Sequence, residues 1–175
     1  ERVEEANYMQ KGVEHTPYEW VRAIAAIKAE AVGNRVEGEK IIIAADTIVT
    51  YMGKILHRPF EREEAASMLR TLSGHKHTVY TGLAVMYKDA DGKYETHTSV
   101  TATDVYMREL TDMEISNYVD TKEPYDKAGG YGIQGKGSLL IDRIDGDYFN
   151  VVGLPLVQLY KELSENGVNI MDFWK

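Results

Sequence analysis

Asp46 is the first residue whose type and position could do chemistry, because it interrupts a run of apolar residues. Residues 41–49 read IIIAADTIV. This pattern predicts a buried β-strand with Asp46 and Thr47 at or near its end. In open α/β sheets, ligands bind beyond the carboxyl ends of strands. A carboxylate there can hold Mg²⁺ and orient a water molecule against a phosphate. The alternative is an aspartate that only caps a turn after a core strand.

A glycine-rich segment over residues 126–132, DKAGGYG, is the second candidate. Glycines let a backbone approach a ligand closely, and Lys127 offers a point charge to a phosphate. Asp126 could bind a metal ion or pair with Lys127. Gln134 follows, and its amide can both donate to and accept from the edge of a base. The alternatives are a flexible hairpin loop and a surface amide. The Walker spacing of a P-loop is absent.

Further charged residues could complete such a site. Lys28, on a predicted helix, and Arg58, in a loop after the Asp46 strand, are either phosphate contacts or solvated surface charges. Glu5 is a solvated charge unless a metal ion lies near it. His75 and His77, without a nearby cysteine, are a weak metal signal. For His77 we therefore expect a structural role, in which its ring forms a hydrogen bond to a loop.

Strands and helices that alternate along the chain must position these residues. Capping residues, glycines and apolar periodicity predict helices over residues 17–33, 61–72, 111–119 and 156–166. Alternating or continuous apolar runs predict strands over residues 41–49, 77–87, 94–107, 138–143 and 148–152. Asp91-Gly92 and Asp145-Gly146 predict turns between strands. The interleaving favours an α/β or α+β fold with a mixed sheet.

Composition limits the classes of protein to which the chain can belong. A chain of 175 residues with 43% apolar and 27% charged residues suits one domain, residues 1–175, or two small lobes. A net charge of −8 argues against binding to polymeric nucleic acid. The absence of cysteine excludes disulfides and zinc–thiolate sites. Apolar runs are too short to span a membrane, and we expect a cytoplasmic protein.

Several blocks occur together in an order that resembles the Maf family. The blocks are AADTIV (44–49), SGHKHTVYTG (73–82), EPYDKAGGYGIQG (123–135), IDGDY (144–148) and VVGLP (151–155). They are similar to the family's ADT-V, SG--H-V-TG, EP-DKAG-YGIQG and closing IDG-Y--V-GLP motifs. The resemblance covers nearly the whole chain, and the EP-DKAG-YGIQG block is highly specific.

The resemblance implies an activity and a fold. Members of the family hydrolyse a nucleoside triphosphate between the α- and β-phosphates, with a divalent cation such as Mg²⁺ or Mn²⁺, and release pyrophosphate. The implied fold is α/β and related to inosine-triphosphate pyrophosphatases. It has a mixed twisted sheet, flanking helices and a deep cleft between two lobes. A homodimer is also implied, with a nucleoside triphosphate as the substrate.

The resemblance also assigns roles to residues. Asp46 matches the proton acceptor that activates water, and it would also bind the metal ion with Glu5. Lys28, Lys127 and Arg58 would hold the phosphates.

Thr47 and Gln134 match the branch of the family that acts on dTTP and UTP. The 7-methyl-GTP branch carries glutamate in place of Gln134. An amide can pair with the donor–acceptor edge of uracil or thymine, whereas a carboxylate accepts two donors from guanine.

The sequence departs from the family pattern at two places. The family usually opens with an S-S-PRR motif, and this sequence begins after it; we expect the motif to be missing from the sequence given rather than from the protein. The usual GKP reads His57-Arg58-Pro59, in which Arg58 keeps the charge. Two alternatives to the dTTP/UTP enzyme stay open: a nucleotide-binding regulator of cell division with little catalysis, and a 7-methyl-GTP pyrophosphatase.

Overall fold

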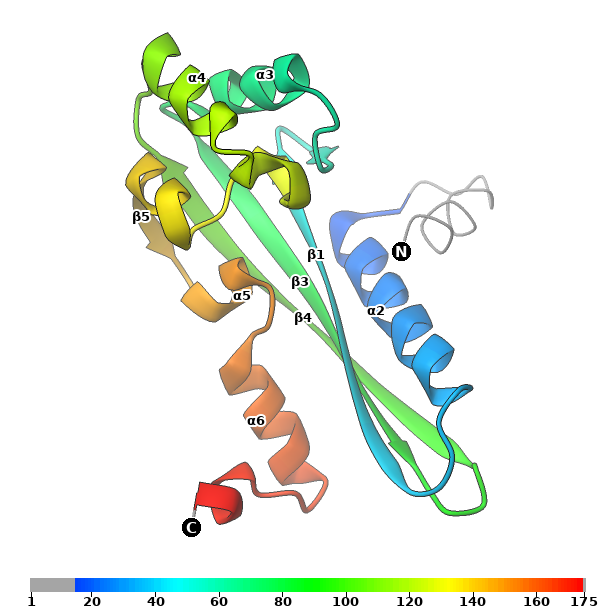
Figure 1. Ribbon diagram of the computed structural model, residues 1–175. Helices are drawn as coiled ribbons and strands as arrows, with labels where there is room; N and C mark the ends of the chain where they lie inside the picture. Colours follow the sequence, from blue (N-terminus) through cyan, green and yellow to red (C-terminus); the bar gives the residue numbers. More distant parts are fainter. Residues whose placement is uncertain (1–14, 175) are drawn as a thin grey trace. The chain divides into compact units, whose positions relative to one another are not determined.

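The computed structural model describes residues 15–174 and contains a five-stranded antiparallel sheet with flanking helices (Figure 1). The strand order is β2-β1-β3-β4-β5. The strands are β1 (Lys40–Tyr51), β2 (Lys54–Leu56), β3 (Lys76–Lys88), β4 (Tyr94–Met107) and β5 (Ile141–Asp145). Among the described residues the chain forms two compact units, unit 1 (15–46, 81–101 and 153–174) and unit 2 (47–80 and 102–152).

The prediction of a mixed sheet was wrong, and a short hairpin explains the error. β1 and β2 pair antiparallel, with Thr50 opposite Ile55 and Tyr51 opposite Lys54. The two residues between these strands, Met52 and Gly53, both have positive φ, at 49° and 76°. Such a turn reverses the chain within two residues. Methionine is an unusual residue at positive φ, so residues 52–53 were not predicted to form a turn.

Unit 1 packs one helix on each face of β3. The first is α2 (Pro17–Gly33), whose Ala25 and Ala29 pack with Ala84. The second is α6 (Leu156–Glu165), which packs against the opposite face through Leu83 and its neighbours. Residues 83 and 84 point to opposite faces because side chains alternate along a strand. Figure 1 shows these helices on the two sides of the long strands of this unit.

The predicted start and end of α2 are confirmed. Thr16 and Glu19 form the expected capping box, in which the Thr16 hydroxyl accepts from the Glu19 N–H at 3.2 Å. Asn34 follows the helix as its C-cap. The apolar stripe that this helix presents to the sheet carries Lys28 on the same side, so the caps fix the length of helix that brings Lys28 to β1.

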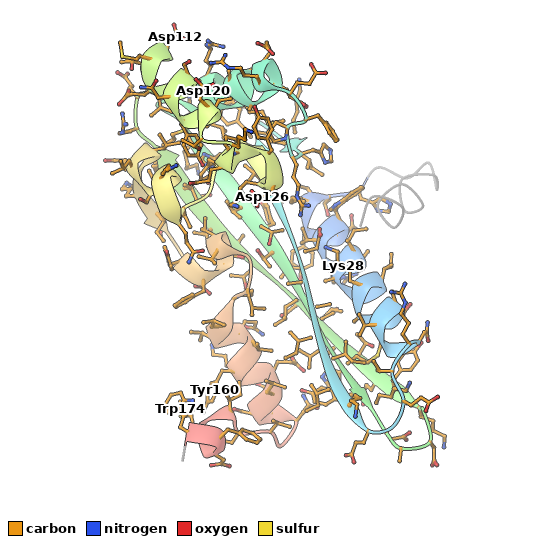
Figure 2. All side chains as sticks on the ribbon, viewed as in Figure 1. Lys28, Asp112, Asp120, Asp126, Tyr160 and Trp174 are labelled. Carbon is orange, nitrogen blue, oxygen red and sulfur yellow. The ribbon has the colours of Figure 1, made fainter. Side chains whose placement is uncertain are left out.

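Unit 2 has its own apolar core beneath two helices, α3 (Arg62–Leu72) and α4 (Asp112–Asp120). Its buried members include Val49, Leu69, Val79, Val105, Ile115 and Tyr131. Ion pairs join the helices at the surface, with Arg62–Asp120 at 3.0 Å and Arg70–Asp112 at 2.8 Å. Both aspartates are labelled in Figure 2. Because these pairs are exposed, the apolar core supplies most of the stability.

Two of the predicted strands were wrong in part or in full. Residues 135–140 form the 3₁₀ helix η3 (Gly135–Leu140), and the strand begins only at Ile141. Residues 148–152 form the helix α5 (Tyr148–Val152). The Asp147 carboxylate accepts from the Phe149 N–H at 2.8 Å, as an N-cap does. The buried Asn150 amide donates to the Val79 carbonyl and the Thr103 hydroxyl. These contacts override the strand propensity of the sequence.

The remaining turns are short. They are η1 (Glu123–Asp126), η2 (Ala128–Gly130) and η4 (Ile170–Trp174). Between residues 15 and 174, none of the helices combines the length and the apolar character that a membrane-spanning helix needs.

Candidate active site

Asp46 lies in the middle of β1 rather than at its end, so the positional argument for it was wrong. The strand continues through Tyr51, and Asp46 is its seventh residue. The apolar run stops at Val49, which is why the sequence predicted an earlier end. The Asp46 residue is only 5% exposed. A buried carboxylate in a strand needs a polar partner, because its isolated charge is costly to remove from water.

Lys28 of α2 supplies that partner within unit 1. Its Nζ lies 2.7 Å from Asp46 Oδ1 and also donates to the Ala45 carbonyl at 3.4 Å. The side chains are 21% and 4% exposed, so the pair is mostly shielded from water. Replacing such a pair with packed apolar residues is often neutral or stabilising. Its occurrence therefore points to chemistry more than to stability. Figure 2 shows Lys28 on α2.

The Lys28–Asp46 pair has the groups needed to bind a phosphate and a divalent cation. The Asp46 carboxylate can accept a proton or coordinate a hard cation, and the Lys28 ammonium can donate to phosphate oxygens. Mg²⁺ is commonly held by one or two carboxylates together with waters and substrate phosphates. Within residues 15–174, no cluster of three or more histidine, aspartate or glutamate side chains could hold a metal ion by itself. Asp46 therefore suits a metal site in which waters and substrate phosphates supply the other ligands. Glu5, the second predicted metal ligand, lies outside the described residues.

Unit 2 brings together two of the predicted phosphate contacts, Arg58 and Lys127. Lys127 Nζ lies 2.7 Å from Asp126 Oδ1. This hydrogen bond lowers the pKa of Asp126 below its ordinary value, partial burial opposes it, and Arg58 adds a smaller lowering through its charge. The Gly129 N–H donates to the His57 carbonyl at 3.1 Å and so ties the two segments together. Because His57 contributes a backbone carbonyl to this bond, its side chain is not required for it.

The glycine-rich segment forms 3₁₀ turns rather than the hairpin loop of the alternative prediction. Gly129 and Gly130 both have positive φ, at 71° and 73°. A Cβ atom at Gly129 would lie 3.0 Å from a Val49 methyl group. This close approach packs the segment against β1, and only glycine meets both the backbone and the space requirement without strain.

Thr47 and Gln134, the predicted base contacts, occupy different kinds of position. Thr47 is half-buried in β1. Because side chains alternate along a strand, Thr47 points away from Asp46 and shares the face of Val49, on which Gly129 packs. Gln134 is exposed, beyond the turns of the glycine-rich segment. The structure thus relates Thr47 to the glycine-rich segment and does not place it on the Asp46 side of the strand.

Glu123 and Tyr118 form a hydrogen-bond network that the sequence did not single out. The Glu123 carboxylate accepts hydrogen bonds from the Tyr118 hydroxyl and from the backbone N–H groups of Lys136 and Gly137. The Tyr118 oxygen accepts in turn from the Gly132 N–H at 3.2 Å. No side-chain pattern marked this network, because two of the three groups that donate to Glu123 are backbone N–H groups.

His77 has the structural role predicted for it. Its Nε2 lies 2.6 Å from the Tyr131 hydroxyl, and the two rings meet edge to face at 5.3 Å. Both residues are buried, and burial lowers the pKa of His77 from 6.5 to about 4. Burial also raises the pKa of Tyr131. A neutral imidazole and a neutral phenol therefore join β3 to the glycine-rich segment.

The lowered pKa of His77 predicts a pH dependence of stability. Between pH 6.5 and about 4 the unfolded imidazole binds a proton and the folded one does not, so the free energy of unfolding falls as pH falls through this range. The difference corresponds to about 3 kcal/mol. In His77→Gln this contribution is absent, because an amide does not titrate. Urea unfolding at pH 7 and pH 4 should show a smaller loss in the variant than in the wild type.

The exposed His75 provides the matched control, since His75→Gln should keep the wild-type pH dependence. Equal losses of stability in His77→Gln and in the wild type would contradict a neutral, buried His77.

The chain is similar to one protein family and to several pyrophosphatases. The family model described as "Maf-like protein" matches residues 2–166. A dTTP/UTP pyrophosphatase of Carboxydothermus hydrogenoformans is 50% identical over 151 residues, which cover 86% of this chain and 79% of the relative. A dTTP/UTP pyrophosphatase of Bacillus cereus is 45% identical over 159 residues, covering 91% and 80%. One of Caldanaerobacter subterraneus subsp. tengcongensis is 49% identical over 151 residues, covering 86% and 72%.

Proposed function

Because this chain belongs to the Maf-like protein family, we propose that it is a pyrophosphatase that hydrolyses dTTP and UTP to the monophosphate and pyrophosphate. Relatives that are 45–50% identical to it over 151–159 aligned residues carry the name dTTP/UTP pyrophosphatase. The observation that carries the chemistry is the buried Asp46 carboxylate with Lys28 at 2.7 Å. This pair offers a proton acceptor beside a cation, which suits the activation of water next to a phosphate.

The proposed reaction is an in-line displacement at the α-phosphorus. A water oxygen forms a bond to the α-phosphorus while the bond from that phosphorus to the α–β bridging oxygen breaks. The water proton passes to an Asp46 carboxylate oxygen, and the electron pair of the broken bond leaves with pyrophosphate. Lys28 donates to phosphate oxygens as negative charge builds on them. Arg58 and Lys127 would hold the outer phosphates, Arg58 through two parallel N–H groups.

Asp46 and Glu5 are the proposed protein ligands of Mg²⁺ or Mn²⁺. When bound, the cation would neutralise phosphate charge and polarise the phosphorus centre. The burial of the Asp46 carboxylate supports this role. Mg²⁺ is commonly bound by one or two carboxylates, and water and phosphate oxygens fill its other coordination sites.

Thr47 and Gln134 are the proposed base contacts. The Gln134 amide can donate to a pyrimidine carbonyl and accept from the ring N–H of uracil or thymine. Cytosine lacks that ring N–H, so an amide held in this orientation would favour uracil and thymine. Lys127 and Gln134 lie on the same ordered segment, which supports its use for both phosphate and base.

Replacing Gln134 with glutamate should shift base preference. A carboxylate accepts but does not donate, so it would leave a uracil carbonyl opposite an acceptor. We expect kcat/KM for UTP to fall by about 10–100-fold, which corresponds to roughly 1.4–2.7 kcal/mol. The kcat/KM for 7-methyl-GTP should rise relative to it. Steady-state pyrophosphate release from both nucleotides measures the shift, and unchanged preference would remove Gln134 from base selection.

A substrate panel tests the function itself. The full-length protein with Mg²⁺ should release pyrophosphate from UTP and dTTP faster than from CTP or 7-methyl-GTP. Tight binding of UTP by calorimetry without turnover would instead favour a nucleotide-binding regulator. Preferred turnover of 7-methyl-GTP would assign the other branch of the family.

The remaining predictions stand on the resemblance. We propose that residues 1–175 form a single Maf-like domain with the fold of the Maf and inosine-triphosphate pyrophosphatases, in which a deep cleft separates two lobes. A homodimer and a cytoplasmic location are proposed on the same basis. Size-exclusion chromatography with light scattering tests the dimer.

A further inference from the structure

We propose that Glu123 is a positioning residue for base selection, and that its carboxylate holds the backbone that presents Gln134. This inference rests on the proposed function, since it assigns a task to a side chain remote from the reacting phosphates. We call Glu123, Tyr118 and the backbone N–H groups of Gly132, Lys136 and Gly137 the carboxylate clamp. All of its members belong to unit 2.

The clamp binds the chain on both sides of Gln134. Glu123 Oε1 accepts from the Gly137 N–H at 2.9 Å, and Oε2 accepts from the Lys136 N–H at 3.1 Å. On the other side, the Gly132 N–H donates to the Tyr118 oxygen at 3.2 Å. Tyr118 then donates to Glu123 Oε1 at 3.0 Å. Residues 132–137 are thereby closed into a loop by one continuous set of hydrogen bonds.

Close packing leaves room only for glycine at two positions of the loop, Gly135 and Gly137. A Cβ atom at Gly137 would lie 2.2 Å from the Gly132 carbonyl oxygen and 2.7 Å from the Tyr118 hydroxyl. Gly135 has a φ of 65°, and a Cβ atom there would lie 3.0 Å from Glu123 Oε2. The two ends of the loop are therefore in backbone contact, and the carboxylate sits against the turn that follows Gln134.

The ionisation states suit these roles. Burial raises the pKa of Glu123, but the N–H groups of Gly137 and Lys136 and the Tyr118 hydroxyl together outweigh it, so the net pKa lies below the ordinary value. Burial raises the pKa of Tyr118, which keeps its hydroxyl protonated as a donor. An ionised carboxylate accepts all three bonds at once, whereas a protonated acid or an amide cannot.

The consequence is a preorganised backbone at Gln134. Gln134 itself is exposed, and its amide forms no hydrogen bond with the other described residues. The clamp therefore fixes the backbone position from which the Gln134 side chain reaches a base. A contact fixed before binding discriminates between ligands better than one that must be ordered by the ligand. The stem of Lys127 also packs at Gly132, where a Cβ atom would lie 2.9 Å from Lys127 Cε. Loosening the clamp should thus affect nucleotide binding before it affects the chemical step.

Glu123→Gln in the full-length protein tests the inference. The amide nitrogen cannot accept, so at least one of the Lys136 and Gly137 N–H groups loses its partner. We expect KM for UTP to rise by about 10-fold with kcat changed by less than about 3-fold, because the clamp does not touch the reacting atoms. The ratio of kcat/KM for UTP to that for CTP should fall by about 10-fold. Glu123→Asp, which keeps the charge, should recover part of this ratio.

Two further variants keep the test decisive. Tyr118→Phe retains the buried ring and removes the hydroxyl that joins Glu123 to Gly132, so it should repeat the loss of UTP preference even if Glu123→Gln folds poorly. Glu165→Gln, on the exposed end of α6, is the matched control and should behave as the wild type.

The outcomes separate this inference from the proposed function. Equal losses for UTP and CTP in both variants, with an unchanged ratio, would overturn the positioning role while leaving the pyrophosphatase intact. If the wild type released no pyrophosphate, the proposed function would fail. Calorimetry with UTP and CTP would then test the role of the clamp in base selection without catalysis. Tighter binding of UTP than of CTP in the wild type, lost in both variants, would support this role. Equal binding of the two nucleotides by the wild type would overturn it.

Discussion

Replacing Asp46 with asparagine is expected to lower kcat for UTP hydrolysis by about 10²–10⁴-fold, the contribution that a positioned general base usually makes. Asparagine has the size and shape of aspartate but does not take up a proton from water. It is also a poorer ligand for a hard cation. The Lys28 ammonium, 2.7 Å from Asp46 in the wild type, can still donate to the amide oxygen, so the contact between α2 and β1 should survive. Steady-state pyrophosphate release from UTP with Mg²⁺ measures the change.

The control for this variant is Asp112→Asn, whose carboxylate is 82% exposed and pairs with Arg70 at the surface. It should retain wild-type kcat. Melting temperature and UTP affinity of Asp46→Asn should be measured beside its activity, because loss of fold would also abolish turnover. Full activity in a folded Asp46→Asn protein would remove Asp46 as the base.

The sequence predicted those parts of the fold that local chemistry determines. The capping boxes at Thr16 and Thr111 placed the starts of α2 and α4 correctly, because a cap is complete within four residues. The β3–β4 hairpin followed from Asp91-Gly92 in the same way. Predictions failed where distant contacts decide: buried hydrogen bonds of Asn150 make α5 a helix despite its β-branched and aromatic residues.

The candidate site was predictable to a different extent. Asp46 was chosen because a carboxylate interrupted an apolar strand, and that signal was sound even though its supposed place at the strand end was wrong. Its partner Lys28 lies 18 positions away along the chain, and the sequence marked it as a candidate phosphate contact but not as the partner of Asp46. Glu123 was missed because its partners are backbone N–H groups, which no side-chain pattern reveals.

Replacing Gly82 with alanine is expected to destabilise the protein by at least about 3 kcal/mol, at the upper end of what overpacking a core usually costs. A Cβ atom at this position would lie 2.2 Å from the Val21 carbonyl oxygen and 2.4 Å from its carbonyl carbon. These are backbone atoms of α2, so no side-chain rotation relieves the clash and the helix must move from β3. Thermal unfolding should show a fall in melting temperature of about 10 °C.

The same substitution should lower kcat, because α2 carries Lys28 to Asp46 and a displaced helix lengthens that 2.7 Å contact. Gly53→Ala separates this effect from backbone strain: Gly53 has a φ of 76° with open space around it, so alanine there meets strain without a clash. It should cost about 1 kcal/mol and leave kcat unchanged. A Gly82→Ala protein with wild-type melting temperature and kcat would show that α2 does not need its close approach to β3. We expect the opposite result. Gly82 lets the α2 backbone lie close to β3, and this close approach allows Lys28 to reach the buried Asp46 carboxylate.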